Sequence, residues 1–229
     1  MVVCLGPSAG RRLRRRKTIR ILTSCYEYPP LGGGGSRVAQ SLSQELVRQG
    51  HDVSVVTMGY DDLPQQEDVE GVKVHRIPCG RRRQYQCSLT EAVAYVWPAT
   101  AAACRISKQA PFDIVHSHFI LPDGIVGRRV KRRSGVPLII TAHGSDVPAY
   151  NPHRLKTAHR LLSPIWKSVV RSADRVVCPS EHLRSLVQQQ ISDLPIERIP
   201  NGIDLGEIDL SQRRKRRILA AARIVKLKG

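Results

Sequence analysis

A run of four glycines, Gly32 to Gly35, is the stretch of this 229-residue sequence whose composition most clearly favours ligand binding. It stands in EYPPLGGGGSRVAQ, residues 27–40, between two prolines and a segment with helical periodicity. Glycine lets a backbone approach a ligand closely, and the start of a helix offers N–H groups and a positive dipole end to an anion. The stretch predicts a loop that faces a phosphate or a sugar, with a flexible surface loop as the alternative.

Histidine side chains occur in or directly after two further predicted strands. HSH places His116 and His118 on one face of a strand, where a metal pair is conceivable, although no third ligand stands at a useful spacing. AHGSD brings His143 and Asp146 to the end of another strand. Because ligands gather outside the carboxyl ends of parallel strands, we expect His143 to lie near the glycine run. The alternative is a hydrogen-bonded structural histidine.

Two familiar glycine motifs do not fit the sequence. Taking Gly33 and Gly35 as the first two glycines of a dinucleotide fingerprint puts Val38 at the third, and the loop is too long for the usual tight turn. No Gly-x-x-x-x-Gly-Lys-Ser/Thr occurs, which excludes a P-loop nucleotidase. A nicotinamide-dependent oxidoreductase would have the right fold but the wrong glycine spacing.

The elements that must position these residues alternate between short β-branched runs and longer helical patterns. Strands are predicted at residues 19–25, 51–58, 71–77, 113–118, 136–143, 174–180 and 196–200. Helices are predicted from an N-cap at Ser36 to Gly50, with Val38, Leu42 and Leu46 on one face, and over 89–109, 123–135, 153–173 and 181–190. Strands without polar alternation, connected by helices, indicate an α/β fold, a doubly wound and Rossmann-like parallel sheet.

The formal net charge of +18 is concentrated in clusters. Residues 11–17, 81–83, 128–133 and 213–217 hold 19 of the 37 basic side chains. Such clusters attract nucleic acid or an anionic membrane, but aromatic residues for base stacking make up only 4% of the chain. We therefore expect no specific nucleic acid partner. If residues 81–83 and 128–133 form one face, we expect a peripheral contact with an anionic membrane there, with a solvated surface as the alternative.

The remaining features of composition concern compartment and domains. No run of about 18 apolar residues occurs, and the first basic cluster follows the first apolar run, so we expect a cytoplasmic protein, with a peripheral position at the inner face of the membrane as the alternative. Residues 1–17 are predicted to be a basic disordered arm, 18–200 the main domain, 201–217 a linker, and 218–229 the start of a second, truncated domain.

An ordered set of segments resembles the retaining GT-B glycosyltransferases of family 4. The segments are EYPPLGGGGSRVAQSLSQELVRQGHDVSVVT, DIVHSHFILPDG, PLIITAHGSDV, ADRVVCPSE, IERIPNGID and ARIVKLKG. The resemblance covers about residues 18–229, and it implies one half of a GT-B fold: the acceptor-side domain with the first strand of the donor domain.

The resemblance also implies roles for individual residues. His143 would contact the donor sugar at the reacting centre. Gly34 and Gly35, with Arg223 and Lys228 at the start of the second domain, would bind the donor phosphates, and the cations would neutralise charge as the sugar leaves. The residues expected on the acceptor or sugar side are Gly33, Asp146 and Asn201. No metal and no cofactor is expected, and a leaving phosphate oxygen would take the acceptor's proton, which gives retention.

The sequence departs from the family where the second domain, with its Glu-x7-Glu element, would follow Gly229. We therefore expect a hexosyltransferase half, with little activity by itself, that serves transfer from a nucleotide sugar to a saccharide or lipid-linked acceptor. The donor, a uridine or guanosine diphosphate sugar, is not specified. The alternative function is a non-catalytic basic Rossmann-like module that binds nucleic acid or another polyanion.

Overall fold

The computed structural model describes residues 18–151 and 156–202 of the chain. The strands are β1 (Arg20–Ser24), β2 (Asp52–Met58), β3 (Gln66–Val69), β4 (Val72–Ile77), β5 (Ile114–His118), β6 (Leu138–Thr141), β7 (Arg175–Cys178) and β8 (Ile196–Arg198). The helices are α1 (Gly34–Arg48), α2 (Leu89–Gln109), α3 (Asp123–Ser134), α4 (Lys156–Val170) and α5 (Glu181–Gln190). The predicted arm 1–17, the linker beyond residue 202 and the segment 218–229 lie outside the described residues.

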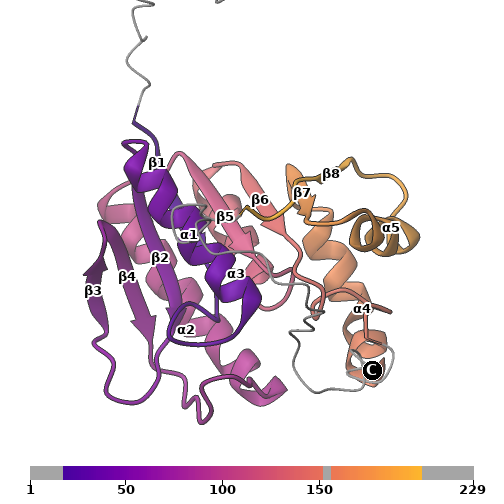
Figure 1. Ribbon diagram of the computed structural model, residues 1–229, viewed down its shortest axis with the longest axis horizontal. Helices are drawn as coiled ribbons and strands as arrows, with labels where there is room; N and C mark the ends of the chain where they lie inside the picture. Colours follow the sequence, from indigo (N-terminus) through magenta and orange to yellow (C-terminus); the bar gives the residue numbers. More distant parts are fainter. Residues whose placement is uncertain (1–17, 152–155, 203–229) are drawn as a thin grey trace, which may run out of the picture.

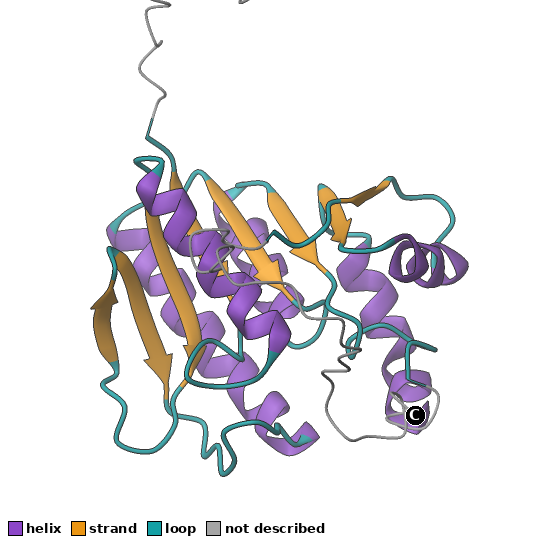
Figure 2. Cartoon of the chain, in the orientation of Figure 1, coloured by secondary structure: helices purple, strands orange, loops and turns teal. Residues whose placement is uncertain are grey.

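The strands form one sheet in the order β3-β4-β2-β1-β5-β6-β7-β8. Every neighbouring pair is parallel except β3 and β4. Figure 2 shows the strands side by side, with helices in front of and behind the sheet. This arrangement confirms the predicted α/β, Rossmann-like fold.

The sheet separates two layers of apolar core, which follow from the alternation of side chains along β2. Val53 and Val55 pack with Ala39 of α1 on one face. Val56 and Met58 belong to the larger core on the other face, where α2, α3 and α4 contribute. Figure 1 shows α1 in front of the sheet and the magenta helix α2 behind it.

The register brings the carboxyl ends of three neighbouring strands to one edge of the sheet. Ser24 in β1 pairs with Ser117 in β5, and His118 in β5 pairs with Thr141 in β6. The glycine run follows β1 and His143 follows β6, so the topology places both at this edge, as the sequence predicts.

Strand β3 is absent from the predicted elements. It pairs with β4 through a two-residue hairpin in which Glu70 and Gly71 have φ of 52° and 81°, as a type I′ turn requires. Its sequence, QEDV, is polar, and β3 is the outermost strand on one side of the sheet. The hydrophobic pattern of β3 was therefore too weak to predict it, and the pairing depends on the turn.

The predicted start of α1 is wrong, and of its predicted apolar face only Leu46 packs against the core. The helix is capped at Gly33 and not at Ser36, whose hydroxyl donates to the Leu31 carbonyl from inside the helix. The buried side chains are Ser36, Ala39 and Ser43, whereas Leu42 is 37% exposed. Small residues bring the start and middle of this helix close to the sheet, and Leu46 and Val47 near its end are partly buried against the same core.

Replacing Gly127 by alanine tests how closely α3 packs on the sheet. A Cβ atom there would lie 2.3 Å from Ser117 Oγ and 2.6 Å from Leu138 Cδ1. Alanine normally stabilises a helix by about 1 kcal/mol over glycine, but overpacking of this kind costs about 1–3 kcal/mol. We expect urea unfolding to show that Gly127→Ala lowers the free energy of unfolding. The control is Gly202→Ala, whose Cβ atom meets no described residue within 4 Å; equal stability of both variants would contradict the packing.

Candidate functional site

The glycine run leads into α1 and leaves the start of this helix open. No side chain caps the helix at Gly33, and its first turn contains no acidic residue. A Cβ atom at Gly33 or Gly34 would meet no atom of residues 18–151 and 156–202 within 4 Å. The first N–H groups of a helix and its positive dipole end suit an anion, so this end of α1 can accept a phosphate.

Gly35 is the point of closest approach between α1 and the neighbouring loops. A Cβ atom there would lie 2.7 Å from the Phe119 ring and 3.1 Å from Cγ of His143. The sequence predicted that the glycine run and His143 lie near each other, and the structure brings them into contact. Gly35 does not have a positive φ, so its backbone conformation would allow any residue. Glycine is required there because a side chain would collide with Phe119 and His143.

The loop before α1 is held in place by the segment that precedes α2. Gly32, with φ of 81°, donates its N–H to the Gln84 carbonyl, and the Gln84 side chain donates to the Pro30 carbonyl, both at 2.9 Å. The side chain of Arg81 is fully buried and pairs with Glu27 at 3.1 Å. The loop is thus tied at several points. Arg81 is also removed from the basic surface that the sequence predicts for residues 81–83.

Three histidines meet at the ends of β5 and β6. His118 Nδ1 lies 3.0 Å from His143 Nε2, and His116 Nε2 lies 2.8 Å from the Thr141 hydroxyl. Burial lowers the pKa of His116 and of His143 to about 4, and it lowers the pKa of His118 well below its usual value. The imidazoles are therefore neutral at pH 7, and one ring of the His118–His143 pair donates a hydrogen bond to the other. His143 is the partly exposed member of this pair.

Phe119 closes the apolar side of the site with a strained backbone. Its φ of 80° is uncommon for a bulky residue, and such strain concentrates at functional sites. The N–H of Phe119 donates to the Thr141 carbonyl at 2.8 Å, and its ring centroid lies 4.6 Å from that of His143. The Tyr26 ring packs edge-on against Phe119 at 5.0 Å. These contacts stabilise the backbone conformation that places the Phe119 ring against Gly35.

Asp146 holds the loop that carries His143. Its carboxylate accepts the N–H groups of Ile120, His143 and Gly144 at 2.7, 3.0 and 2.9 Å. Its backbone carbonyl accepts the indole N–H of Trp166 at 2.7 Å. Burial raises the pKa of Asp146, whereas these N–H groups lower it. The structure shows a positioning role for Asp146, while its contact with a sugar stays a prediction.

A second buried acid, Asp123, stands at the start of α3. It accepts hydrogen bonds from the Ser24 hydroxyl at 2.7 Å and the Tyr26 N–H at 3.0 Å. The Tyr95 hydroxyl of α2 lies at 3.5 Å. Burial raises the pKa of Asp123 to about 8. Asp123 thus joins the end of β1 to α2 and α3 behind the candidate site.

Of the three remaining predicted site residues, the structure describes one. Asn201 is exposed in the segment after β8. Arg223 and Lys228 lie outside the described residues. Within residues 18–151 and 156–202, no group of three His, Cys, Asp or Glu side chains is arranged to hold a metal ion. The rings of His116 and His118 contact each other at a tilt of 36°, but their ring nitrogens contact Thr141 and His143.

Sequence reasoning missed several residues that shape this site. His118 was noticed in HSH but interpreted as half of a metal pair, because its contact with His143 joins residues 25 positions apart. Arg81 was counted with the surface cations, and Asp123 was not singled out. The phenylalanine after HSH carries no sequence signal for positive φ. Only the polar residues that follow each strand could have directed attention to this edge.

Gly35→Ala and Gly34→Ala form a matched pair that tests the close approach of α1. The Cβ atom of Gly35→Ala would collide with Phe119 and His143, whereas that of Gly34→Ala meets open space. We expect Gly35→Ala to lose about 1–3 kcal/mol of unfolding free energy and to shift the NMR signals of the His143 ring. Gly34→Ala should leave both unchanged, apart from a small gain in helix propensity. The same behaviour in both variants would argue against the contact.

The neutral state of His143 can be followed by histidine side-chain NMR between pH 7.5 and 3.5. Its lowered pKa predicts that the folded ring takes up a proton only near pH 4. Histidines of the unfolded chain take up protons near pH 6.5, so unfolding is favoured as pH falls from about 6.5 to about 4. His143 thus has no pH-dependent effect on the free energy of unfolding above about pH 6.5, and lowers it as the pH falls from about 6.5 to about 4. A titration of the folded His143 ring near pH 6.5 would be inconsistent with its burial.

Comparison with known proteins identifies the family. Residues 32–207 match the family model for Glycosyltransferase Family 4. A putative teichuronic acid biosynthesis glycosyltransferase of Bacillus subtilis, TuaC, is 31% identical and covers 87% of this chain and 54% of the relative. A D-inositol 3-phosphate glycosyltransferase of Segniliparus rotundus is 29% identical, over 90% of this chain and 47% of the relative. The alpha-monoglucosyldiacylglycerol synthase of Streptococcus pneumoniae is 24% identical, over 83% and 42%.

Solved structures agree with the fold. The sucrose-phosphate synthase of Thermosynechococcus elongatus superposes with a TM-score of 0.70 at 18% identity, over 82% of this chain and 49% of that structure. The chain thus spans about half the length of the proteins that it matches. Since the family model matches residues 32–207, well over half of the chain, this chain belongs to Glycosyltransferase Family 4.

Proposed function

We propose that this chain supplies the acceptor-side half of a hexosyltransferase that uses a nucleotide-sugar donor. The observation that carries the proposal is the contact between Gly35, at the open start of α1, and the neutral ring of His143. An anion site and a partly exposed imidazole then stand side by side at the carboxyl edge of the sheet. A sugar diphosphate has both parts that such an arrangement fits: a charged phosphate and a polyhydroxyl ring.

Each described residue has a stated part in this proposal. The N–H groups at Gly34 and Gly35 face the donor phosphate, where the helix dipole favours negative charge. His143 contacts the donor sugar, and because it is neutral it can offer or accept a hydrogen bond without placing a charge at the reacting centre. Asp146 and His118 fix the orientation of His143. Gly33 and Asn201 belong to the acceptor or sugar side.

The chemistry follows from charge that develops on the leaving phosphate. As the bond to the sugar breaks, Arg223 and Lys228 would neutralise the phosphate together with the helix start. A phosphate oxygen takes the proton of the acceptor hydroxyl on the face from which the phosphate departs, so the sugar is transferred with retention. In this proposal no metal ion or cofactor takes part.

The proposed acceptor is a saccharide or a lipid-linked molecule, and the proposed location is the cytoplasm or the inner face of a membrane. The names of the relatives support this range, since they include enzymes for teichuronic acid, inositol phosphate and diacylglycerol glycosides. No specific nucleic acid partner is proposed. Because the relatives are about twice as long, we expect residues 1–229 alone to transfer little sugar.

The test is a fusion of this chain to the part of Bacillus subtilis TuaC that follows the matched region. We expect the fusion to transfer sugar from a panel of radiolabelled uridine and guanosine diphosphate sugars, and His143→Ala to lower the rate at least about 100-fold. The control is His182→Ala, an exposed histidine of α5. Equal rates for the fusion and its His143→Ala variant would overturn the role of His143. Robust transfer by residues 1–229 alone would overturn the expected inactivity.

A further inference from the structure

The outward side of α2 carries a stripe of exposed apolar side chains. Leu89, Val93 and Trp97 are spaced four residues apart and are 51%, 61% and 66% exposed. Residues at this spacing lie on one face of a helix. Single exposed apolar side chains are ordinary, but three aligned ones that include a tryptophan form a surface that favours an interface.

A cation of α3, Arg129, lies directly beside this stripe. The guanidinium of Arg129 stacks over the Trp97 ring at 4.1 Å. The next positions of α3 add Lys131, Arg132 and Arg133. An exposed tryptophan next to arginine combines an amphipathic ring with a positive charge, the pairing found where proteins meet the headgroup layer of a bilayer.

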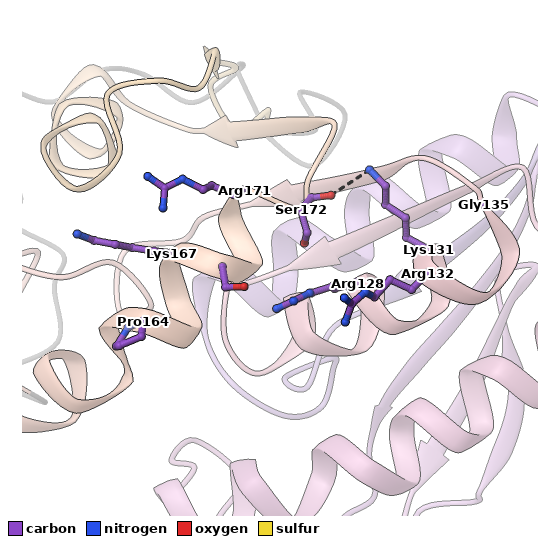
Figure 3. A pocket seen from close by; sticks show the side chains of 9 residues that line it. Arg128, Lys131, Arg132, Gly135, Pro164, Lys167, Arg171 and Ser172 are labelled. Carbon is purple, nitrogen blue, oxygen red and sulfur yellow. Dashed lines mark hydrogen bonds between the residues drawn. The ribbon is translucent and has the colours of Figure 1, made fainter.

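Between α3 and α4 the surface is hollowed, with a volume of about 710 Å³. Arg128, Lys131 and Arg132 of α3 line it from one side, and Lys167 and Arg171 from the other. Figure 3 shows these side chains around the hollow, with Lys131 turned toward Ser172. The ends of α3 and α4 precede β6 and β7, so the hollow lies at the opposite edge of the sheet from His143.

Acidic side chains do little to balance this charge. Asp123 of α3 is buried, and Glu91 of α2 is engaged in the capping box with Ser88. Lys131 pairs with Asp174 at 2.6 Å and Arg171 with Asp193 at 3.6 Å. In the described part of the chain, no ion pair involves Arg128, Arg132 or Lys167. These three cations are therefore available to an external anion.

We propose that this surface docks on an anionic phospholipid bilayer. The basic helical face, as we name it, consists of Leu89, Val93 and Trp97 on α2, Arg128 and Arg132 on α3, and Lys167 on α4. The apolar stripe enters the interfacial layer, while lipid phosphates bind the cations around the hollow. No described helix is long and apolar enough to cross a membrane, so the proposed contact is peripheral.

The apolar stripe is the reason to favour a bilayer over a nucleic acid. A polynucleotide would use the same cations, but Leu89 and Val93 offer it neither stacking nor hydrogen bonds. A bilayer accommodates both kinds of side chain at once. The proposed face includes no residue of the candidate site, so binding to it needs neither donor nor acceptor, and its failure would leave the proposed transferase function standing.

The two tryptophans of the chain provide a direct readout. Trp97 is 66% exposed, whereas Trp166 is 2% exposed and reports on the intact core. The 229-residue chain is mixed with vesicles of equal parts phosphatidylglycerol and phosphatidylcholine, or of phosphatidylcholine alone. We expect co-sedimentation and a blue shift of tryptophan emission with the anionic vesicles only, and a weaker effect at high salt. In Trp97→Tyr the shift should disappear.

A pair of double variants locates the charge that is responsible. Arg128→Gln/Lys167→Gln removes two cations of the basic helical face, and we expect about 30-fold weaker vesicle binding, since each surface cation contributes about fivefold. Arg37→Gln/Arg48→Gln removes two exposed cations of α1, on the other face of the sheet, and should bind as the unchanged chain does. The basic residues 11–17 are present in every variant. Trp166 emission before vesicles are added checks that each variant is folded.

Three outcomes would overturn the proposal. They are the absence of binding to anionic vesicles, binding that both double variants weaken equally, and binding without a Trp97-dependent shift. A separate measurement uses duplex RNA in place of vesicles. Tight, salt-sensitive RNA binding that Arg128→Gln/Lys167→Gln abolishes, with vesicles left unbound, would assign the face to nucleic acid instead.

Discussion

The candidate site depends on the absence of a side chain at one position. Gly35 lets the first turn of α1 contact the ring of His143, which the register of β1, β5 and β6 has brought to the same edge of the sheet. Any larger residue would separate the helix start from the imidazole. The strained backbone of Phe119 beneath Gly35, and the carboxylate of Asp146 behind His143, are arranged around this contact.

The chemistry at this edge is set by burial. Removing imidazoles from water favours their neutral form, and it favours the protonated form of a carboxyl group such as Asp123. The three histidines thus carry no charge near neutral pH, and the described features of the site that favour an anion are the dipole and N–H groups of α1. Backbone N–H donors of this kind need no counterion and lose no side-chain entropy when they bind an anion.

Much of the fold was predictable, because the central strands are buried β-branched runs whose length and flanking turns are distinctive. The polar strand β3 was not, since it is specified by the Glu70-Gly71 turn. The start of α1 was misplaced because the helix begins inside the glycine run, although glycine is a poor helix former, and because the Ser36 hydroxyl binds the Leu31 carbonyl and caps no helix. Topology alone brought the glycine run to His143. The partners His118 and Asp123 could not be predicted, because each makes its contacts with residues 25 or more positions away.

Helix α1 differs from α2 in how it is attached to the sheet. Its buried side chains are Ser36, Ala39 and Ser43, whereas α2 buries Tyr95 and five further residues. The small side chains of α1 remove little apolar area from water, so this helix gains less free energy from packing. Local opening concentrates where apolar contacts are few. The wall of the candidate site formed by α1 can therefore change its position at a lower free-energy cost than the larger core behind the sheet, while the hydrogen bonds to Gln84 hold the loop before it.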